Sequence, residues 1–134
     1  MYRKGLQSTV MTAEALTSVF AAVGDVVDIR GMRDISLHVT AAGTDNTVLE
    51  VFVDPTAETA PADASASGMH LYATVAAGAA VDVTVPTGGK RLFPLGGLSG
   101  NFIAFKGKSH STNGCTATVV VTGNVETGGQ SEGL

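Results

Sequence analysis

The residues best suited to chemistry in this chain are three histidines and one cysteine. His38, His70 and His110 are far apart, and none has a second histidine at the short spacing that a metal site on one strand or helix uses. Cys115 is the only cysteine, so it cannot form an intrachain disulfide. It alternates with apolar residues such as Val119, which predicts a small buried hydrophobic side chain. We therefore expect neither a metal site nor a cofactor.

Two glycine-rich segments are similar to enzyme motifs but lack their key residues. Residues 88–91 (Gly-Gly-Lys-Arg) end like a phosphate-binding loop, yet Arg91 stands where Ser or Thr would hold magnesium. Residues 97–100 (Gly-Leu-Ser-Gly) differ from a nucleophile elbow, which needs Gly two residues after the Ser, where this chain has Asn101. We predict a hairpin turn at the first segment, a flexible connector at the second and a protein that is not an enzyme.

The elements that must position these residues are strands. Residues 35–40, 81–85 and 115–122 alternate apolar and polar side chains, and a period of two places one face in a core and the other in water. The 134 residues include 17 Gly and 4 Pro, which suits many short strands joined by tight turns. The predicted strands are 26–30, 35–41, 47–53, 70–75, 80–86, 90–94, 101–106 and 115–122.

This pattern predicts one all-β domain, an antiparallel β-sandwich that is jelly-roll-like, with an immunoglobulin-like topology as the open alternative. The chain lacks Trp and paired cysteines, which argues against a true immunoglobulin domain. Residues 1–13 are predicted to form an extended N-terminal arm, 14–125 the sandwich and 126–134 a flexible tail. Residues 14–23 fit either a helix face or a strand, and their neighbours favour the strand.

Charge and hydropathy exclude two classes of partner. The net charge of −4 and the absence of a long basic run argue against nucleic acid. No stretch approaches the roughly 20 apolar residues of a membrane span, and polar residues interrupt the N-terminal segment where a signal peptide would be apolar.

Residues 54–69 form a long predicted loop, poor in large apolar groups, which is typical of a functional or disordered segment.

Several strands carry apolar residues on both faces. Phe52, Tyr72, Phe102 and Val120 fall on the nominally outer faces of their predicted strands. Ordinary surface scatter, or a sandwich with both faces partly covered, would explain this pattern. The sharper hypothesis is an interface between identical subunits, and we predict a homotrimer.

The runs at residues 24–31, 35–40 and 47–54, with the closing segments 102–105 and 118–124, resemble the small β-sandwich virion proteins of tailed bacteriophages. Capsid decoration (cement) proteins are the most similar type. The resemblance implies a trimer on the outer capsid surface, with the major capsid protein as partner and an arm that reaches across capsid subunits. Within the predicted arm, Tyr2, Arg3, Lys4, Val10 and Met11 are the candidate partner-binding residues, because they suit an acidic, partly apolar surface.

A binding module is the alternative from a different class. Such a domain would recognise a receptor or a carbohydrate from a phage tail or a cell surface. Sugar sites generally use exposed aromatic residues and clustered polar groups, whereas this chain has no Trp and only two Tyr. The decoration protein therefore explains more of the sequence.

Overall fold

The computed structural model describes residues 2–43, 46–78, 90–110 and 115–127, with the side chains of residues 2–4, 126 and 127 outside that description. All regular elements in these ranges are strands, which confirms the predicted all-β class. No helix there is long and apolar enough to cross a bilayer. The strands are β1 (Tyr2–Leu16), β2 (Ala21–Asp28), β3 (Arg33–Gly43), β4 (Asn46–Asp54), β5 (His70–Gly78), β6 (Lys90–Pro94), β7 (Phe102–Ser109) and β8 (Cys115–Thr127).

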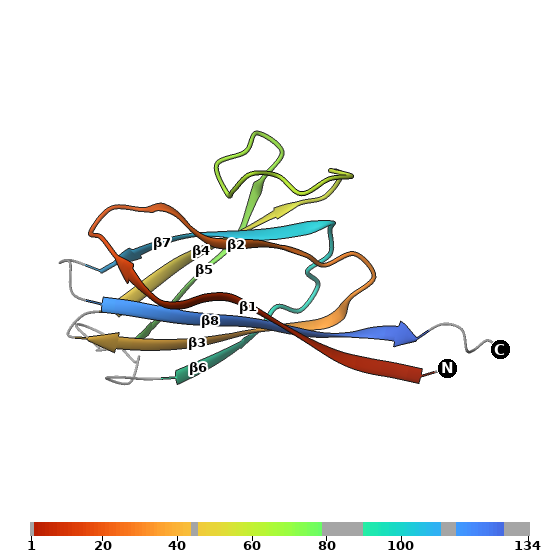
Figure 1. The fold of residues 1–134 in the computed structure, drawn as a ribbon, viewed down its shortest axis with the longest axis horizontal. Coiled ribbons are helices and arrows are strands. Elements are labelled where there is room, and N and C mark those ends of the chain that lie inside the picture. The colour runs from red at the N-terminus through yellow and green to blue at the C-terminus, as the bar shows by residue number, and fades with distance from the viewer. Residues whose placement is uncertain (1, 44–45, 79–89, 111–114, 128–134) are drawn as a thin grey trace.

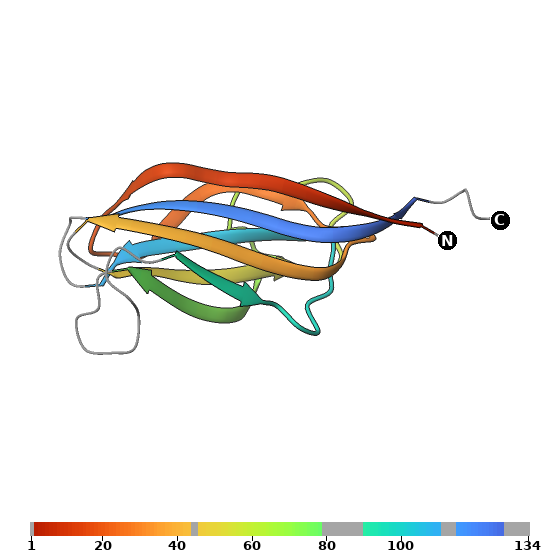
Figure 2. The ribbon, with the colours of Figure 1, turned by 90° about the horizontal axis from the view of Figure 1, so that it is seen from below.

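The strands form two four-stranded antiparallel sheets packed as a sandwich (Figure 1). Sheet A has the order β1-β8-β3-β6, and sheet B has the order β2-β7-β4-β5. This confirms the predicted antiparallel β-sandwich, and most connections cross from one sheet to the other. Strands β1 and β2 therefore lie along one lateral side of the sandwich, and β5 and β6 lie along the other (Figure 2).

Alternating residues of both sheets meet in one core. On sheet A, Leu37 and Val121 are fully buried, and on sheet B so are Leu49, Ile103 and Val51. Each fully buried aliphatic side chain stabilises the fold by about 1.5–3 kcal/mol. The period-two pattern of β3, β4 and β8 thus fixes which side chains face outward.

The prediction of a separate N-terminal arm is wrong. Residues 2–13 belong to β1, which pairs with β8 along its length, and Val10 and Met11 are 2% and 4% exposed in the core. The register shifts twice, between Thr9 and Met11 and between Met11 and Glu14. These bulges break the alternation, so two consecutive apolar residues point inward and the strand pattern disappears from the sequence.

The ambiguous segment 14–23 is the end of β1, a turn and the start of β2, so the helix alternative is wrong. The other predicted strands match within a few residues, except 80–86, which lies outside the described residues. A turn joins β2 to β3, with Gly31 at φ 77° and the Met32 amide donating to the Ile29 carbonyl.

The far ends of β1 and β8 extend beyond the sandwich as a two-stranded ribbon (Figure 1). Tyr2, Arg3 and Lys4 pair with Thr127, Glu126 and Val125, whereas β3 pairs with β8 only as far as Asn124. The ribbon is defined here as residues 2–4 and 125–127. It is the element that reaches furthest from the core.

The long loop after β4 is ordered by Asp54. The buried Asp54 carboxylate accepts hydrogen bonds from the backbone amides of Thr56 (3.0 Å) and Ala57 (2.9 Å). These bonds hold the pKa of Asp54 below its ordinary value of 3.8. The Asn101 side-chain amide donates to the Ala57 carbonyl at 2.8 Å, which ties the loop to the start of β7.

Candidate functional site

The residues with the most reactive side chains are separated by the fold. His38 faces outward on sheet A, where its Nε2 lies 3.0 Å from the Thr122 hydroxyl. Cys115 is 3% exposed, as predicted, and its thiol lies 2.9 Å from the Ser109 hydroxyl. The Thr47 hydroxyl donates to the same sulfur at 3.4 Å. Within the described ranges, no group of three or more His, Cys, Asp or Glu residues is placed to hold a metal ion.

Phe102 does not lie on an open face. Its side chain is 3% exposed because Arg30 covers the ring, with the guanidinium carbon 5.1 Å from the ring centroid. Arg30 pairs with Asp28 and donates to the Glu58 carbonyl of the long loop at 3.3 Å. The hydrogen bond from Arg30 lowers the pKa of Asp28. The prediction of Phe102 as an exposed interface residue is therefore wrong.

The other predicted interface residues remain at the surface, and two of them belong to apolar groups. On the outer face of sheet A, Val120 lies opposite His38, and His38 lies opposite Leu92 on the edge strand β6. Leu92 is 56% exposed. A hollow of about 240 Å³ lies beside Leu92 and is lined also by His38 and Lys90.

The second group lies around β5, which neighbours β6 on the same lateral side (Figure 2). Leu71 is 54% exposed and pairs with Phe52 of β4, and Tyr72 is 40% exposed at a bulge in β5. The Tyr72 hydroxyl donates to the Gly96 carbonyl at 2.6 Å, which fixes its ring beside the segment after β6. We call the two groups together the apolar band: Val120, His38 and Leu92 on the outer face of sheet A, and Tyr72, Leu71 and Phe52 on sheet B, on either side of the β5–β6 edge.

Cations lie beside the band, and Lys90 and Arg91 line the hollow that contains Leu92. The Lys106 ammonium lies 5.3 Å from the centroid of the Phe52 ring, so it covers one end of the band. On sheet A the residues around Val120 are polar but uncharged. They are Thr9, Thr118, Thr122 and Ser36. Exposed large apolar residues next to uncharged polar ones are typical of a contact between proteins.

The sequence prediction missed Leu71 and Leu92, the most exposed residues of the band. Both lie on strands that were predicted, and Leu92 shares the outer face of β6 with Lys90 and Pro94, alternating with Arg91 and Phe93. That alternation could have identified Leu92, whereas the bulge between Val51 and Phe52 hides the orientation of Leu71.

The predicted arm residues divide into two groups. Val10 and Met11 are in the core, so their side chains are not available to a partner, and that part of the prediction is wrong. The backbones of Tyr2, Arg3 and Lys4 are in the ribbon, and their side chains lie outside the described residues.

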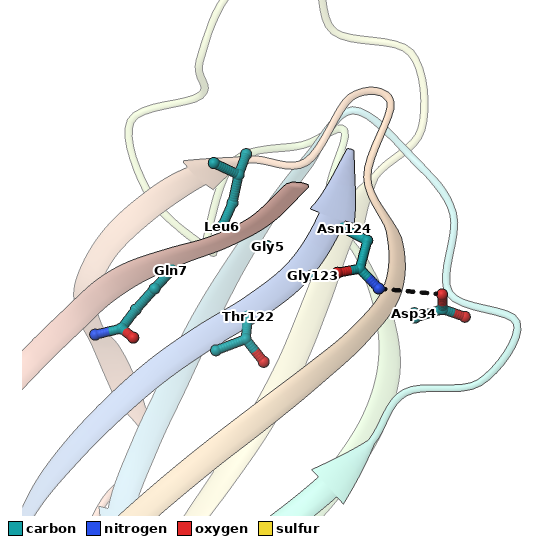
Figure 3. Close-up of a pocket in the computed structure, with 7 residues that line it drawn as sticks. All are labelled: Gly5, Leu6, Gln7, Asp34, Thr122, Gly123 and Asn124. Carbon is teal, nitrogen blue, oxygen red and sulfur yellow. Dashed lines mark hydrogen bonds between the residues drawn. The ribbon is translucent and has the colours of Figure 1, made fainter. Parts of the chain in front are cut away.

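A shallow polar pocket lies at the root of the ribbon, on sheet A (Figure 3). Its volume is about 370 Å³. It is lined by Gly5, Leu6, Gln7, Asp34, Thr122, Gly123 and Asn124. Nothing in the sequence pattern pointed to this group, because strand pairing brings together residues from β1, β3 and β8.

Comparisons with known proteins find distant likenesses in structure. No family model matches the chain, and no curated protein matches it. Among solved structures, the SPBc2 prophage-derived protein YomS has a TM-score of 0.44 and 17% identity, over 91% of this chain and 96% of that one. A chain from the infectious bursal disease virus Gx strain has a TM-score of 0.49 and 11% identity, over 95% of this chain and 33% of that one. This chain thus spans about a third of the viral chain, and neither likeness assigns a function to it.

Proposed function

We propose that this chain is a structural virion protein that self-associates through the apolar band and decorates the outer surface of a phage capsid. The observation that carries the proposal is the band itself. Leu92, Leu71 and Tyr72 are 56%, 54% and 40% exposed along one lateral side of the sandwich. Burying them against a second subunit would remove this apolar surface from water.

The class of partner follows from the sequence resemblance to phage decoration proteins. Most of the segments that carry this resemblance form β2, β3, β4, β7 and β8, which make up most of both sheets. The proposed trimer leaves the ribbon free, since the ribbon extends β1 and β8 whereas the band is centred on β5 and β6.

We propose that the ribbon makes the capsid contact. Its sequence contains Arg3 and Lys4, and these cations complement an acidic patch on a capsid subunit. A trimer presents three ribbons at once, so each weak contact raises the effective concentration of the next. Binding to the assembled shell and not to its dissociated subunits would stabilise the shell by mass action.

Co-sedimentation with shells tests this proposal. Purified protein is mixed with capsids of the encoding phage that lack it, and the bound fraction is measured as a function of concentration. The proposal expects saturable binding, and an Arg3→Gln/Lys4→Gln variant should bind much less while keeping its melting temperature. A wild-type protein that stays in the supernatant, or a variant that binds equally well, would contradict the proposed contact.

A further inference from the structure

The polar pocket at the root of the ribbon has features that the sandwich itself does not require. It lies on the outer face of sheet A, between β1, β8 and the start of β3 (Figure 3). Its volume of about 370 Å³ is at the lower end of the range for small-molecule sites. It shares no residue with the apolar band.

A glycine opens the pocket. Gly5 lies in β1 opposite Asn124, and its backbone does not have a positive φ, so no turn requires glycine at this position. A Cβ built at Gly5 would have its nearest neighbour, Asn124 Oδ1, at 4.0 Å. Glycine within a strand weakens the strand, and one established reason for it is the close approach of a ligand.

Gly123, on the neighbouring strand, has a different explanation. A Cβ at that position would lie 2.6 Å from the Met32 Cε and 3.2 Å from the Arg33 carbonyl oxygen. Packing of the turn between β2 and β3 therefore requires Gly123. Gly5 is the glycine of this pocket that packing leaves unexplained.

The backbone at Asp34 is also unusual. Asp34 has a φ of 55°, in the left-handed region that L-residues seldom adopt. It lies in a bulge, because Arg33 pairs with Asn124 and Ser36 pairs with Thr122, so two residues of β3 oppose one residue of β8. Bulges redirect side chains, and strained backbone is concentrated at functional sites.

The bulge brings the Asp34 carboxylate to the pocket. The Asn124 side-chain amide donates to Asp34 Oδ2 at 3.3 Å, as the dashed line in Figure 3 shows. Gln7 lies on the outer face of β1, two residues from Gly5 and opposite Thr122. The lining therefore includes one carboxylate, two amides and one hydroxyl, with the Asp34 carboxylate and the Asn124 amide together on one side of Gly5 and Gln7 on the other (Figure 3).

These groups match a neutral, hydroxyl-rich ligand. A carboxylate accepts hydrogen bonds, and amides and hydroxyls both donate and accept them, as sugar hydroxyls do. Among the side chains that the structure describes, no Lys, Arg or His lines the pocket, which disfavours an anion, and Asp34 is the one carboxylate, which is too few ligands for a metal ion. The described lining holds no aromatic ring, so a sugar here would be held by hydrogen bonds and not by stacking. We propose that this pocket binds a saccharide unit in that way, with Asp34 and Asn124 as the central hydrogen-bonding pair.

Titration by NMR tests this site on the whole chain. Backbone amide signals of ¹⁵N-labelled protein are followed during separate additions of glucose, galactose, mannose and N-acetylglucosamine. At least one of these sugars should give saturable shifts centred on Gly5, Gln7, Asp34 and Asn124. Inorganic phosphate and calcium chloride, added in parallel, should leave these signals unchanged.

Two variants make the test specific. Gly5→Gln fills the pocket from the face that Gln7 shares, and Asp34→Gly removes the carboxylate while keeping a residue suited to the positive φ. Each should raise the Kd for the sugar at least tenfold, whereas Thr118→Val, on the same face of β8 but outside the pocket, should bind like wild type.

The site is overturned if none of the four sugars gives saturable shifts, if the shifts centre elsewhere, or if phosphate or calcium binds instead. Wild-type affinity in either folded variant also overturns it. If Gly5→Gln does not fold, Asp34→Gly decides the matter. Self-association is measured separately, so failure of this site leaves the decoration proposal standing.

Discussion

Replacing Leu92 with Ser should weaken self-association without weakening the fold. Leu92 is 56% exposed on the edge strand β6, and full burial of a leucine side chain is worth about 1.5–3 kcal/mol. Burying the exposed half in an interface therefore contributes about 1 kcal/mol per subunit. In a trimer the three copies together contribute about 3 kcal/mol, which corresponds to a roughly 100-fold change in the overall association constant.

Light scattering coupled to size-exclusion chromatography, over a range of loading concentrations, measures this change. The wild-type chain should have about three times its mass of 13.5 kDa at micromolar concentration, and Leu92→Ser should dissociate at higher concentration. The melting temperature of dissociated Leu92→Ser should match that of the dissociated wild type, because substitutions of exposed side chains change stability by only about 0.5 kcal/mol.

Val19→Ser is the matched control. Val19 is 69% exposed in the turn between β1 and β2, on the opposite lateral side from the band. It should leave the association constant unchanged. Equal dissociation of both variants, or a wild-type chain that is monomeric at micromolar concentration, would refute the assignment of the band as the interface.

Three further predictions concern the fold. Leu49→Ala, at a fully buried position, should cost about 2–5 kcal/mol and lower the midpoint of guanidinium unfolding at an unchanged m-value. Gly68→Ala should lower the melting temperature because its Cβ would clash with Asp54 Oδ2, whereas Gly96→Ala, with no atom within 4 Å of its Cβ, should not. The folded pKa of Asp54 is below the ordinary value of 3.8, so its stabilising contribution is present above that pH and lost as pH falls through the lower folded value. Between neutral pH and pH 2, the melting temperature of Asp54→Asn should fall less than that of the wild type. An equal fall in both proteins would contradict this.

The strands could be predicted where apolar and polar residues alternate along the chain, and they were missed where this alternation is interrupted. Strands β3, β4 and β8 have long period-two runs, so their positions and inward faces followed directly from the sequence. Strand β1 was missed because two bulges and a positive φ of 45° at Ala13 interrupt its alternation. Its pairing with β8 is a contact between the two ends of the chain, which local sequence patterns do not encode.

The candidate surfaces were predicted only in part, because exposure depends on what covers a face. Phe52 and Val120 remain on outer faces as alternation predicts, and Tyr72 is exposed at the bulge in β5. Phe102 also faces outward, yet Arg30 and the ordered loop after Asp54 bury it. The order of that loop comes from hydrogen bonds between a carboxylate and nearby amides, and its low-complexity sequence does not reveal them.

Thermal release of DNA from phage particles is the most direct test of capsid decoration. Particles that lack this protein are heated with increasing amounts of the purified chain, and a dye that binds released DNA gives the midpoint of release. Decoration predicts a midpoint that rises with added protein and reaches a plateau when the lattice sites are filled. A midpoint that does not move at saturating concentrations of folded, associated protein would contradict the central claim.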